Sequence, residues 1–160
     1  MYKNYQKIDL YSNYIKSFNI QSTSLKIKDD WRARCIGWNQ EISKKICKFI
    51  LSKEKVATYS LPWLYKYFPY SKPSCGEFII QLDFEGKPCA LVQTTELQEI
   101  QFKDINSEHS SLDGPPVRDI KVWKNLHTQY WNNLLNTYDM KVGEQMPVII
   151  EKFTCIYPKK

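Results

Sequence analysis

Three β-rich runs in the second half of the chain constrain its fold most strongly. They read FIIQLDF (78–84), CALVQTTELQEI (89–100) and MPVIIEKFTCIY (146–157). The sequence EGKP (85–88) separates the first two runs and has the composition of a turn, which predicts a hairpin. The second run is apolar at first and alternating later, as expected of a strand that leaves the core. The fold must therefore contain a sheet.

Helical periodicity appears in three other segments. The apolar residues that recur every three or four positions are Tyr5, Ile8, Tyr11, Tyr14, Ile15 and Phe18, then Ile42, Ile46, Phe49 and Ile50, then Trp123, Leu126, Tyr130, Trp131 and Leu134. The second helix is expected from about residue 40 to 52, and Asn39 is placed to cap it, because its side chain can accept a backbone N–H of the first turn. Residues 19–38 lack a clean period and indicate a connection. Helices around hairpin-linked strands predict an α+β fold built on a small barrel.

Charge is distributed unevenly along the 160 residues. Residues 1–80 contain 14 Lys and Arg against 6 Asp and Glu, whereas residues 81–160 contain 9 against 11. The basic half is also rich in Tyr and Trp, and cations with aromatic faces suit phosphates and unpaired bases. Lysine-rich surfaces that serve only solubility have the same composition, and composition alone favours that reading. No run reaches the roughly 18 apolar residues of a membrane helix, and the polar N-terminus does not resemble a signal peptide, so we expect a cytoplasmic protein without membrane contact.

Motifs for metal, cofactor and nucleotide chemistry are missing from the sequence. His109 and His127 are the only histidines and form no metal-binding pattern. Five cysteines, an odd number without C-x-x-C spacing, support neither a disulfide framework nor a zinc ribbon. No P-loop, G-x-G-x-x-G or G-x-S-x-G sequence occurs. We therefore expect no metal and no cofactor, and we interpret His127 as a packing histidine rather than a catalytic base.

The stretch FILSKEKVATYSLPW (49–63) passes within a few residues from an apolar helix to lysines and then hydroxyls. A carboxylate that takes a proton, a hydroxyl or water that attacks, and a lysine that holds an oxyanion would suffice to hydrolyse an amide. Lys55, Thr58 and Tyr59 in this stretch, together with Asp113, are the candidates for these roles. Taken one by one, each is better explained as an ordinary surface residue, and sequence spacing alone does not bring them together.

A family resemblance supplies the missing connection. IGWNQEISKKICKFILSKEKVATYSL resembles the entry segment of the ASCH domain, a member of the PUA-like superfamily, in which a helix runs into G-x-K-x-x-T. KPSCGEFIIQLDFEGKPCALVQTTELQEIQFKDI resembles the paired strands of that family, LDGPPVRDIKVWKNLH its acidic loop and following helix, and EQMPVIIEKFTCIY its last strand. The similarity runs in unbroken order over residues 36–157. Within the family, the chain resembles the longer ASCH proteins and the branch of N4-acetylcytidine amidohydrolases.

This resemblance implies a PUA-like barrel with helices at its mouth, formed by residues 36–160. Residues 1–35 would then form an added N-terminal helix and a connection packed on the domain. In the amidohydrolase branch a Lys, a Thr and a Glu carry the chemistry, and they fall on Lys55, Thr58 and Asp113. The acidic loop departs from the family pattern, since it reads DGPPV (113–117), and Lys53 replaces a usual Gly. These departures favour binding over catalysis.

The resemblance also implies a ligand cleft, on which Lys55, Thr58, Asp113 and the Trp123 helix should converge. The residues expected to bind RNA or a modified nucleoside are Tyr59, Trp63, Arg118, Trp123, Lys124 and His127. Trp63 is equally consistent with a buried plug after Pro62. Three functions stay open: binding of RNA or a modified nucleoside, hydrolysis of such a ligand by an amidohydrolase or weak ribonuclease, and a protein-interaction adaptor that exposes the N-terminal tyrosine stripe. The sequence does not indicate an oligomeric state.

Overall fold

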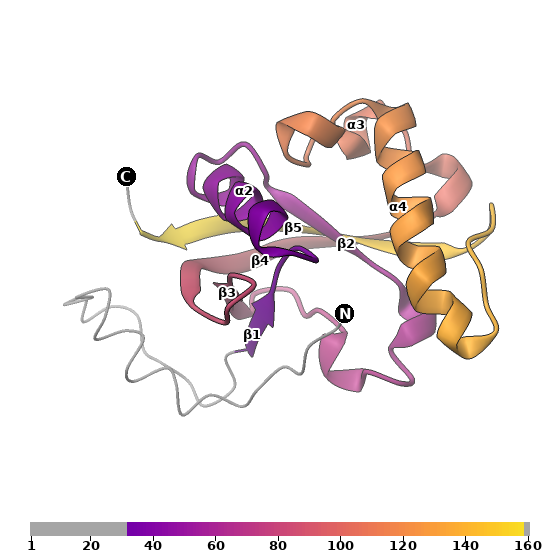
Figure 1. Ribbon diagram of the computed structural model, residues 1–160, viewed down its shortest axis with the longest axis horizontal. Helices are drawn as coiled ribbons and strands as arrows, with labels where there is room; N and C mark the ends of the chain where they lie inside the picture. The colour runs from indigo at the N-terminus through magenta and orange to yellow at the C-terminus, as the bar shows by residue number, and fades with distance from the viewer. Residues whose placement is uncertain (1–31, 159–160) are drawn as a thin grey trace.

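The computed structural model describes residues 32–158, and the five strands in that range form one curved sheet (Figure 1). In spatial order the strands are β1 (Arg32–Cys35), β3 (Phe78–Leu82), β4 (Pro88–Gln101), β5 (Pro147–Tyr157) and β2 (Ala57–Ser60). β1 runs parallel to β3, and every other neighbouring pair is antiparallel. The two short strands are therefore the edges of the sheet.

The long strands β4 and β5 make this sheet curl. Their register shifts between Leu91 and Val92 and again between Thr94 and Glu96. Such bulges bend a strand and increase its twist, so the sheet closes toward a half-barrel. The edges β1 and β2 then flank a concave face on which side chains from both ends of the sheet meet.

Three α-helices lie around the sheet: α2 (Gln40–Leu51), α3 (Ser107–Ser110) and α4 (Ile120–Leu135). Short 3₁₀ turns η1 (Pro62–Leu64), η2 (Pro69–Ser71), η3 (Phe102–Asp104), η4 (Pro115–Val117) and η5 (Asn136–Tyr138) connect the elements. Asn39 caps α2 as expected, because its Oδ1 accepts the backbone N–H of Ile42 at 2.9 Å. Asp119 caps α4 in the same way. Both helix starts are thus fixed locally.

The core is divided between the two larger helices. On one side, α4 buries Trp123, Trp131 and Leu135 against the start of β5. On the other side, α2 buries Ile50 against β3, β4 and Phe153. Truncating a fully buried Trp costs about 3–5 kcal/mol, so the α4 cluster anchors its half of the domain. The two helices leave the concave face between them.

The structure confirms the predicted strands of the second half, the helix after Asn39 and the helix around Trp123. Residues 32–35 belong to strand β1 and not to a connection, and residues 57–60 form strand β2. The predicted N-terminal helix lies outside the described residues. None of the helices between residues 32 and 158 is long and apolar enough to span a bilayer.

Candidate functional site

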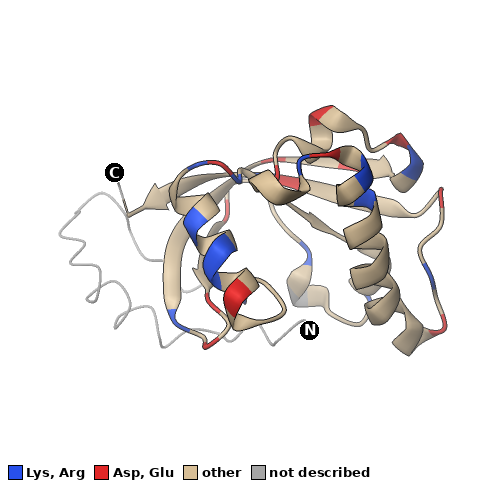
Figure 2. Cartoon of the chain, turned by 45° about the horizontal axis from the view of Figure 1, so that its top comes forward, with Lys and Arg blue, Asp and Glu red and all other residues tan. Residues whose placement is uncertain are grey.

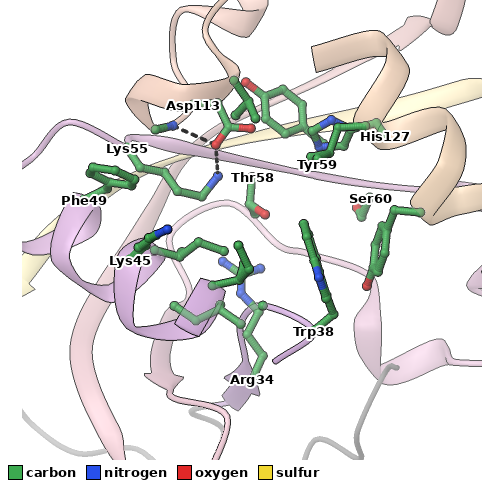
Figure 3. Close-up of a pocket in the computed structure, with 18 of the residues that line it drawn as sticks. Arg34, Trp38, Lys45, Phe49, Lys55, Thr58, Tyr59, Ser60, Asp113 and His127 are labelled. Atoms are coloured by element: carbon green, nitrogen blue, oxygen red, sulfur yellow. Dashed lines mark hydrogen bonds and ion pairs between the residues drawn. The ribbon is translucent and has the colours of Figure 1, made fainter. Parts of the chain in front are cut away.

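A cavity of about 320 Å³ opens on the concave face between α2 and α4 (Figure 3). β1 and the loop after it supply one wall, α2 the next, and the edge strand β2 the back. The acidic loop after α3 and one face of α4 complete the lining, and Glu151 of β5 lies within it. Segments from the whole described chain therefore build one site.

An ion pair between Lys55 and Asp113 dominates one end of this cavity (Figure 3). Lys55 Nζ donates to Asp113 Oδ1 at 2.6 Å, and both side chains are less than a tenth exposed. The same oxygen accepts the N–H of Gly114 at 2.8 Å, and Oδ2 accepts the indole N–H of Trp123 at 3.2 Å. Three donors therefore hold the carboxylate, which in turn fixes the ammonium of Lys55 at the cavity wall.

The end of α2 explains why Lys55 lies here. Lys53 takes a left-handed φ of +61°, the conformation that the usual Gly would adopt without strain. The N–H groups of Glu54 and Lys55 then bond to the carbonyl of Phe49. The chain turns directly from helix to strand, so replacing the Gly by Lys53 preserves the turn.

The acidic loop is tied to the same turn. The N–H groups of Val56 and Ala57 both donate to the carbonyl of Leu112. The guanidinium of Arg118 donates to the carbonyls of Asp113 and Glu54, at 3.1 and 2.7 Å. Arg118 thus holds the loop against the turn and is not part of the cavity lining, and its expected ligand contact stays a prediction.

The edge strand β2 places hydroxyls at the back of the cavity. Thr58 and Ser60 share one face of the strand, and Thr58 lies directly opposite Glu151 of β5. Ser60 shares a hydrogen bond of 2.6 Å with the hydroxyl of Tyr65. The Thr58 hydroxyl makes no hydrogen bond to any residue of the described part of the chain, so it is free to bind a ligand.

Tyr59 and His127 form an aromatic layer with Trp123 beneath the ion pair. The Tyr59 hydroxyl donates to the carbonyl of His109 at 2.7 Å, and its ring meets the edge of Trp123 at 4.7 Å between centroids. Burial, with the nearby charge of Asp113, raises the pKa of Tyr59 well above its usual range. Tyr59 is therefore a fixed neutral phenol whose hydroxyl is already occupied.

His127 stacks on Trp123 with centroids 3.8 Å apart, and its Nδ1 lies 2.9 Å from the Trp123 carbonyl. A carbonyl oxygen only accepts, so Nδ1 carries the proton and Nε2 is an unprotonated acceptor. Burial lowers the pKa of His127 to about 4, against the opposing effect of Asp113. The cavity thus contains a neutral imidazole, and the interpretation of His127 as a packing residue stays a prediction.

Sequence reasoning missed a second buried ion pair in the lining. Arg34 donates to Glu151 Oε2 at 2.8 Å, and Thr94 donates to Oε1 at 2.9 Å. The side chain of Glu151 is 2% exposed. Arg34 and Glu151 lie 117 positions apart in β1 and β5, so only the folded sheet reveals the pair.

Sequence reasoning also did not identify Trp38 as a residue of the cavity lining. Its ring lies 5.8 Å from that of Tyr130, measured between centroids.

Four of the expected ligand residues lie outside the cavity lining: Arg118, Trp123, Lys124 and Trp63. Trp123 is fully buried one layer behind Asp113. Lys124 donates to the carbonyl of Lys103 and lies over the ring of Phe102. Trp63 is 37% exposed and borders a separate, shallow hollow with Lys66 and Lys141, so it is neither a cavity wall nor a buried plug. The turn at Pro62 directs Leu64 into the core and Trp63 outward.

Within residues 32–158, no three His, Cys, Asp or Glu side chains are arranged to hold a metal ion. The polar groups of the cavity include two buried ion pairs, hydroxyls, a neutral imidazole and, at its edge, the exposed Lys45. They surround an apolar surface from α2, the β1–α2 loop and α4. This combination suits a small polar ligand with a flat apolar face.

A sequence model of the ASCH domain matches residues 34–157. The crystal structure of an ASCH domain from Lactobacillus crispatus JV V101 superposes with a TM-score of 0.80 at 16% identity, covering 92% of this chain and 94% of the other. A protein from Enterococcus faecalis V583 superposes with a TM-score of 0.70 at 18% identity, covering 91% and 85%. No curated protein matches the sequence. At such identities, the structural likeness establishes the fold alone.

Proposed function

This chain belongs to the ASCH domain family, and on that premise we propose that it binds an unpaired base in the cavity between α2 and α4. The base is carried by an RNA strand or by a modified nucleoside. The family is PUA-like and often linked to RNA binding. The observation that carries the proposal is the set of groups gathered in one cavity: the Lys55 ammonium, the free Thr58 hydroxyl and the neutral His127 ring.

The size and polarity of the cavity fit a single base. Its volume of about 320 Å³ is near the lower end of ligand pockets, which span ~300–1,000 Å³. Lys55 supplies donors, the Nε2 atom of His127 supplies an acceptor, and the Thr58 hydroxyl supplies either. The edge of a base presents both donors and acceptors. A purely apolar ligand would give no partner to the Thr58 hydroxyl or to the Nε2 atom of His127.

Exposed lysines of α2 suit the phosphates of an RNA strand. Lys44, Lys45 and Lys48 are exposed on α2, where Figure 2 shows positions of Lys and Arg, and Lys45 also lines the cavity. When such lysines contact the phosphates of single-stranded RNA, counterions are released. The logarithm of the affinity therefore falls with the logarithm of the salt concentration, by about 0.7 per phosphate. Binding of RNA should therefore weaken between low and moderate salt.

A titration with labelled RNA tests this proposal. The probe is a fluorescein-labelled single-stranded RNA octamer of mixed sequence, followed by anisotropy at low and moderate salt. Unlabelled cytidine, uridine and N4-acetylcytidine serve as competitors and separate a free nucleoside from an RNA strand as the preferred carrier. The Thr58→Val variant should bind more weakly by about 2- to 13-fold, the worth of one hydrogen bond.

The Thr154→Val variant is the matched control, because Thr154 is exposed on β5 and outside the cavity lining. It should bind as the parent protein does. Absence of binding to both RNA and nucleosides by the parent protein would overturn the proposal. Equal losses in the two variants would place the contact elsewhere.

Hydrolysis of the same ligand is the second candidate function. It is favoured by one observation: the ammonium of Lys55, the unpaired hydroxyl of Thr58 and the carboxylate of Asp113 share one cavity. In such a reaction, water or the Thr58 hydroxyl would attack the amide carbonyl, and Lys55 would stabilise the oxyanion. However, Asp113 already accepts three hydrogen bonds, which ranks binding ahead of catalysis.

Turnover of N4-acetylcytidine to cytidine and acetate distinguishes the two functions. A hydrolase would release acetate in proportion to enzyme and time, and Asp113→Asn would lower the rate by ~10²–10⁴-fold if Asp113 is the general base. A binding protein would retain N4-acetylcytidine without releasing acetate. Equal turnover by the parent and by Asp113→Asn would contradict the catalytic assignment of Asp113.

A further inference from the structure

We infer that Trp38 is the surface on which the ligand ring stacks, so that the cavity selects a planar heteroaromatic base. This inference rests on the proposed function and names the residue that recognises the ring. Neither Tyr59 nor Trp63 is available for this role in the cavity. The ring of Tyr59 is 9% exposed and packed on Trp123, and Trp63 borders another hollow.

Trp38 combines high exposure with a place in the cavity lining. Trp38 is 45% exposed, which is unusual for so large an apolar residue, and it lines the cavity. The ring of Tyr130 on α4 lies beside it at 5.8 Å and an angle of 32°. Figure 3 shows the indole edge-on, with one face turned across the cavity toward Lys45 and Phe49. One face of Trp38 therefore remains open to a ligand.

The short loop that holds Trp38 is fixed on both sides. Gly37 has a φ of +77°, and a Cβ at this position would lie 2.7 Å from the backbone nitrogen of Ser43. Any other residue is therefore excluded by conformation and by space. Asn39 on the other side caps α2. Because the loop is anchored before any ligand arrives, little ordering is needed when a ring stacks on Trp38.

The opposite side of the cavity completes a slot for a flat ring. Phe49 and the side chain of Lys45 come from α2 and face Trp38 across the opening (Figure 3). Figure 3 shows the Lys55 ammonium and Thr58 between Phe49 and Trp38. A ring that lies against the indole would present its edge to these polar groups. A sugar or a free phosphate has no flat face for this slot, whereas any base has one.

Binding to two strands that differ only in their bases tests the inference. The first probe is the fluorescein-labelled RNA octamer, and the second is an abasic octamer with the same sugar-phosphate backbone. The parent protein should prefer the first probe. Trp38→Ala should lower this preference by about 5- to 150-fold, the range of one stacked base, and Trp38→Phe should keep more of it.

Trp63→Ala is the matched control, since Trp63 is similarly exposed but lies outside the cavity lining. It should keep the full preference of the parent. If Trp38→Ala retained that preference, the inference would be wrong although the proposed function would stand. If the parent bound neither RNA nor free nucleosides, the proposed function and this inference would both fall. Quenching of indole fluorescence by the RNA octamer should decrease in Trp38→Phe and persist in Trp63→Ala.

Discussion

Lys55 Nζ lies 2.6 Å from Asp113 Oδ1, although 58 positions separate the two residues in the sequence. The pair joins the turn after α2 to the acidic loop before α4. Both side chains are almost fully buried, so each charge depends on the other for its stability. Substituting either residue therefore leaves the other charge buried in the cavity wall without a partner.

A double-mutant cycle should reveal this dependence. Asp113→Asn leaves the Lys55 ammonium without a counter-charge in the interior, and we expect the free energy of unfolding to fall by about 3–5 kcal/mol. Lys55→Met should also destabilise the fold. The double variant should be more stable than the sum of the two losses predicts, by at least ~1 kcal/mol. Urea unfolding of the four proteins measures the coupling.

The exposed pair Glu41 and Lys45 on α2 provides the control cycle. Its side chains are 75% and 55% exposed, so water screens the interaction. Variants Glu41→Gln and Lys45→Met should show no measurable coupling. Additive losses at Lys55 and Asp113 would mean that the pair contributes no more than a surface contact.

The neutral state of His127 predicts a pH dependence of stability. Burial lowers its pKa from an ordinary value near 6.5 to about 4. Between these values the unfolded chain binds a proton that the folded chain does not. The stabilisation is therefore fully present above pH 6.5 and is lost as the pH falls toward 4, by up to about 3 kcal/mol.

His127→Gln should remove this part of the pH dependence. The difference in unfolding free energy between the parent and the variant, measured by urea unfolding at several pH values, should shrink from pH 6.5 to pH 4. His109→Gln serves as control, because His109 lies in the short helix α3, where its side chain accepts the backbone N–H of Asn106 in an exposed hydrogen bond. A difference that stays constant over this pH range would show that His127 does not have a lowered pKa.

Gly114 is required by the space available beside α2. A Cβ at this position would lie 2.6 Å from Cδ2 of Phe49, although the backbone φ of −62° suits any residue. Gly114→Ala should therefore displace Phe49 and destabilise the protein by about 1–3 kcal/mol. Gly143→Ala, with nothing within 4 Å, should change stability little. Equal melting temperatures for the two variants would contradict the tight contact.

The lysines of α2 should control the salt dependence of RNA binding. Lys45→Gln and Lys48→Gln should each lower the affinity and reduce the slope of log affinity against log salt by about 0.7 if each contacts one phosphate. Lys141→Gln, which borders the separate hollow beside Trp63, should leave the slope unchanged. If the slope of log affinity against log salt were unchanged in all three variants, the lysines of α2 would not contact the RNA phosphates.

The helix after Asn39, the helix around Trp123 and the strands of the second half were predictable from the sequence, because their apolar residues recur with a helical period or form β-rich runs. The strands at 78–82, 88–101 and 147–157 follow from such runs, and the cap at Asn39 follows from the residue type before the helix. The four-residue strands β1 and β2 are too short to carry a period: β1 was missed, and a barrel strand beginning near Thr58 was expected only from the family resemblance. They are nevertheless the two edges that flank the cavity.

The convergence of Lys55, Thr58 and Asp113 came from the family resemblance, and the structure places all three in the cavity lining. Their roles in binding or catalysis stay predictions. Trp38 and the pair of Arg34 with Glu151 had no signal in the sequence. Their function in the site depends on which side chains face inward across distant strands, and that is decided by the curvature of the sheet.

Photo-crosslinking tests the central claim most directly. The RNA octamer is prepared with 4-thiouridine at a central position, bound to the protein, irradiated, and the linked peptides are identified by mass spectrometry. We predict crosslinks in the segments that line the cavity, residues 36–49 and 55–60, and their loss in Trp38→Ala. Crosslinks confined to segments outside the cavity lining, or a yield that unlabelled RNA does not reduce, would contradict binding of a base in this cavity.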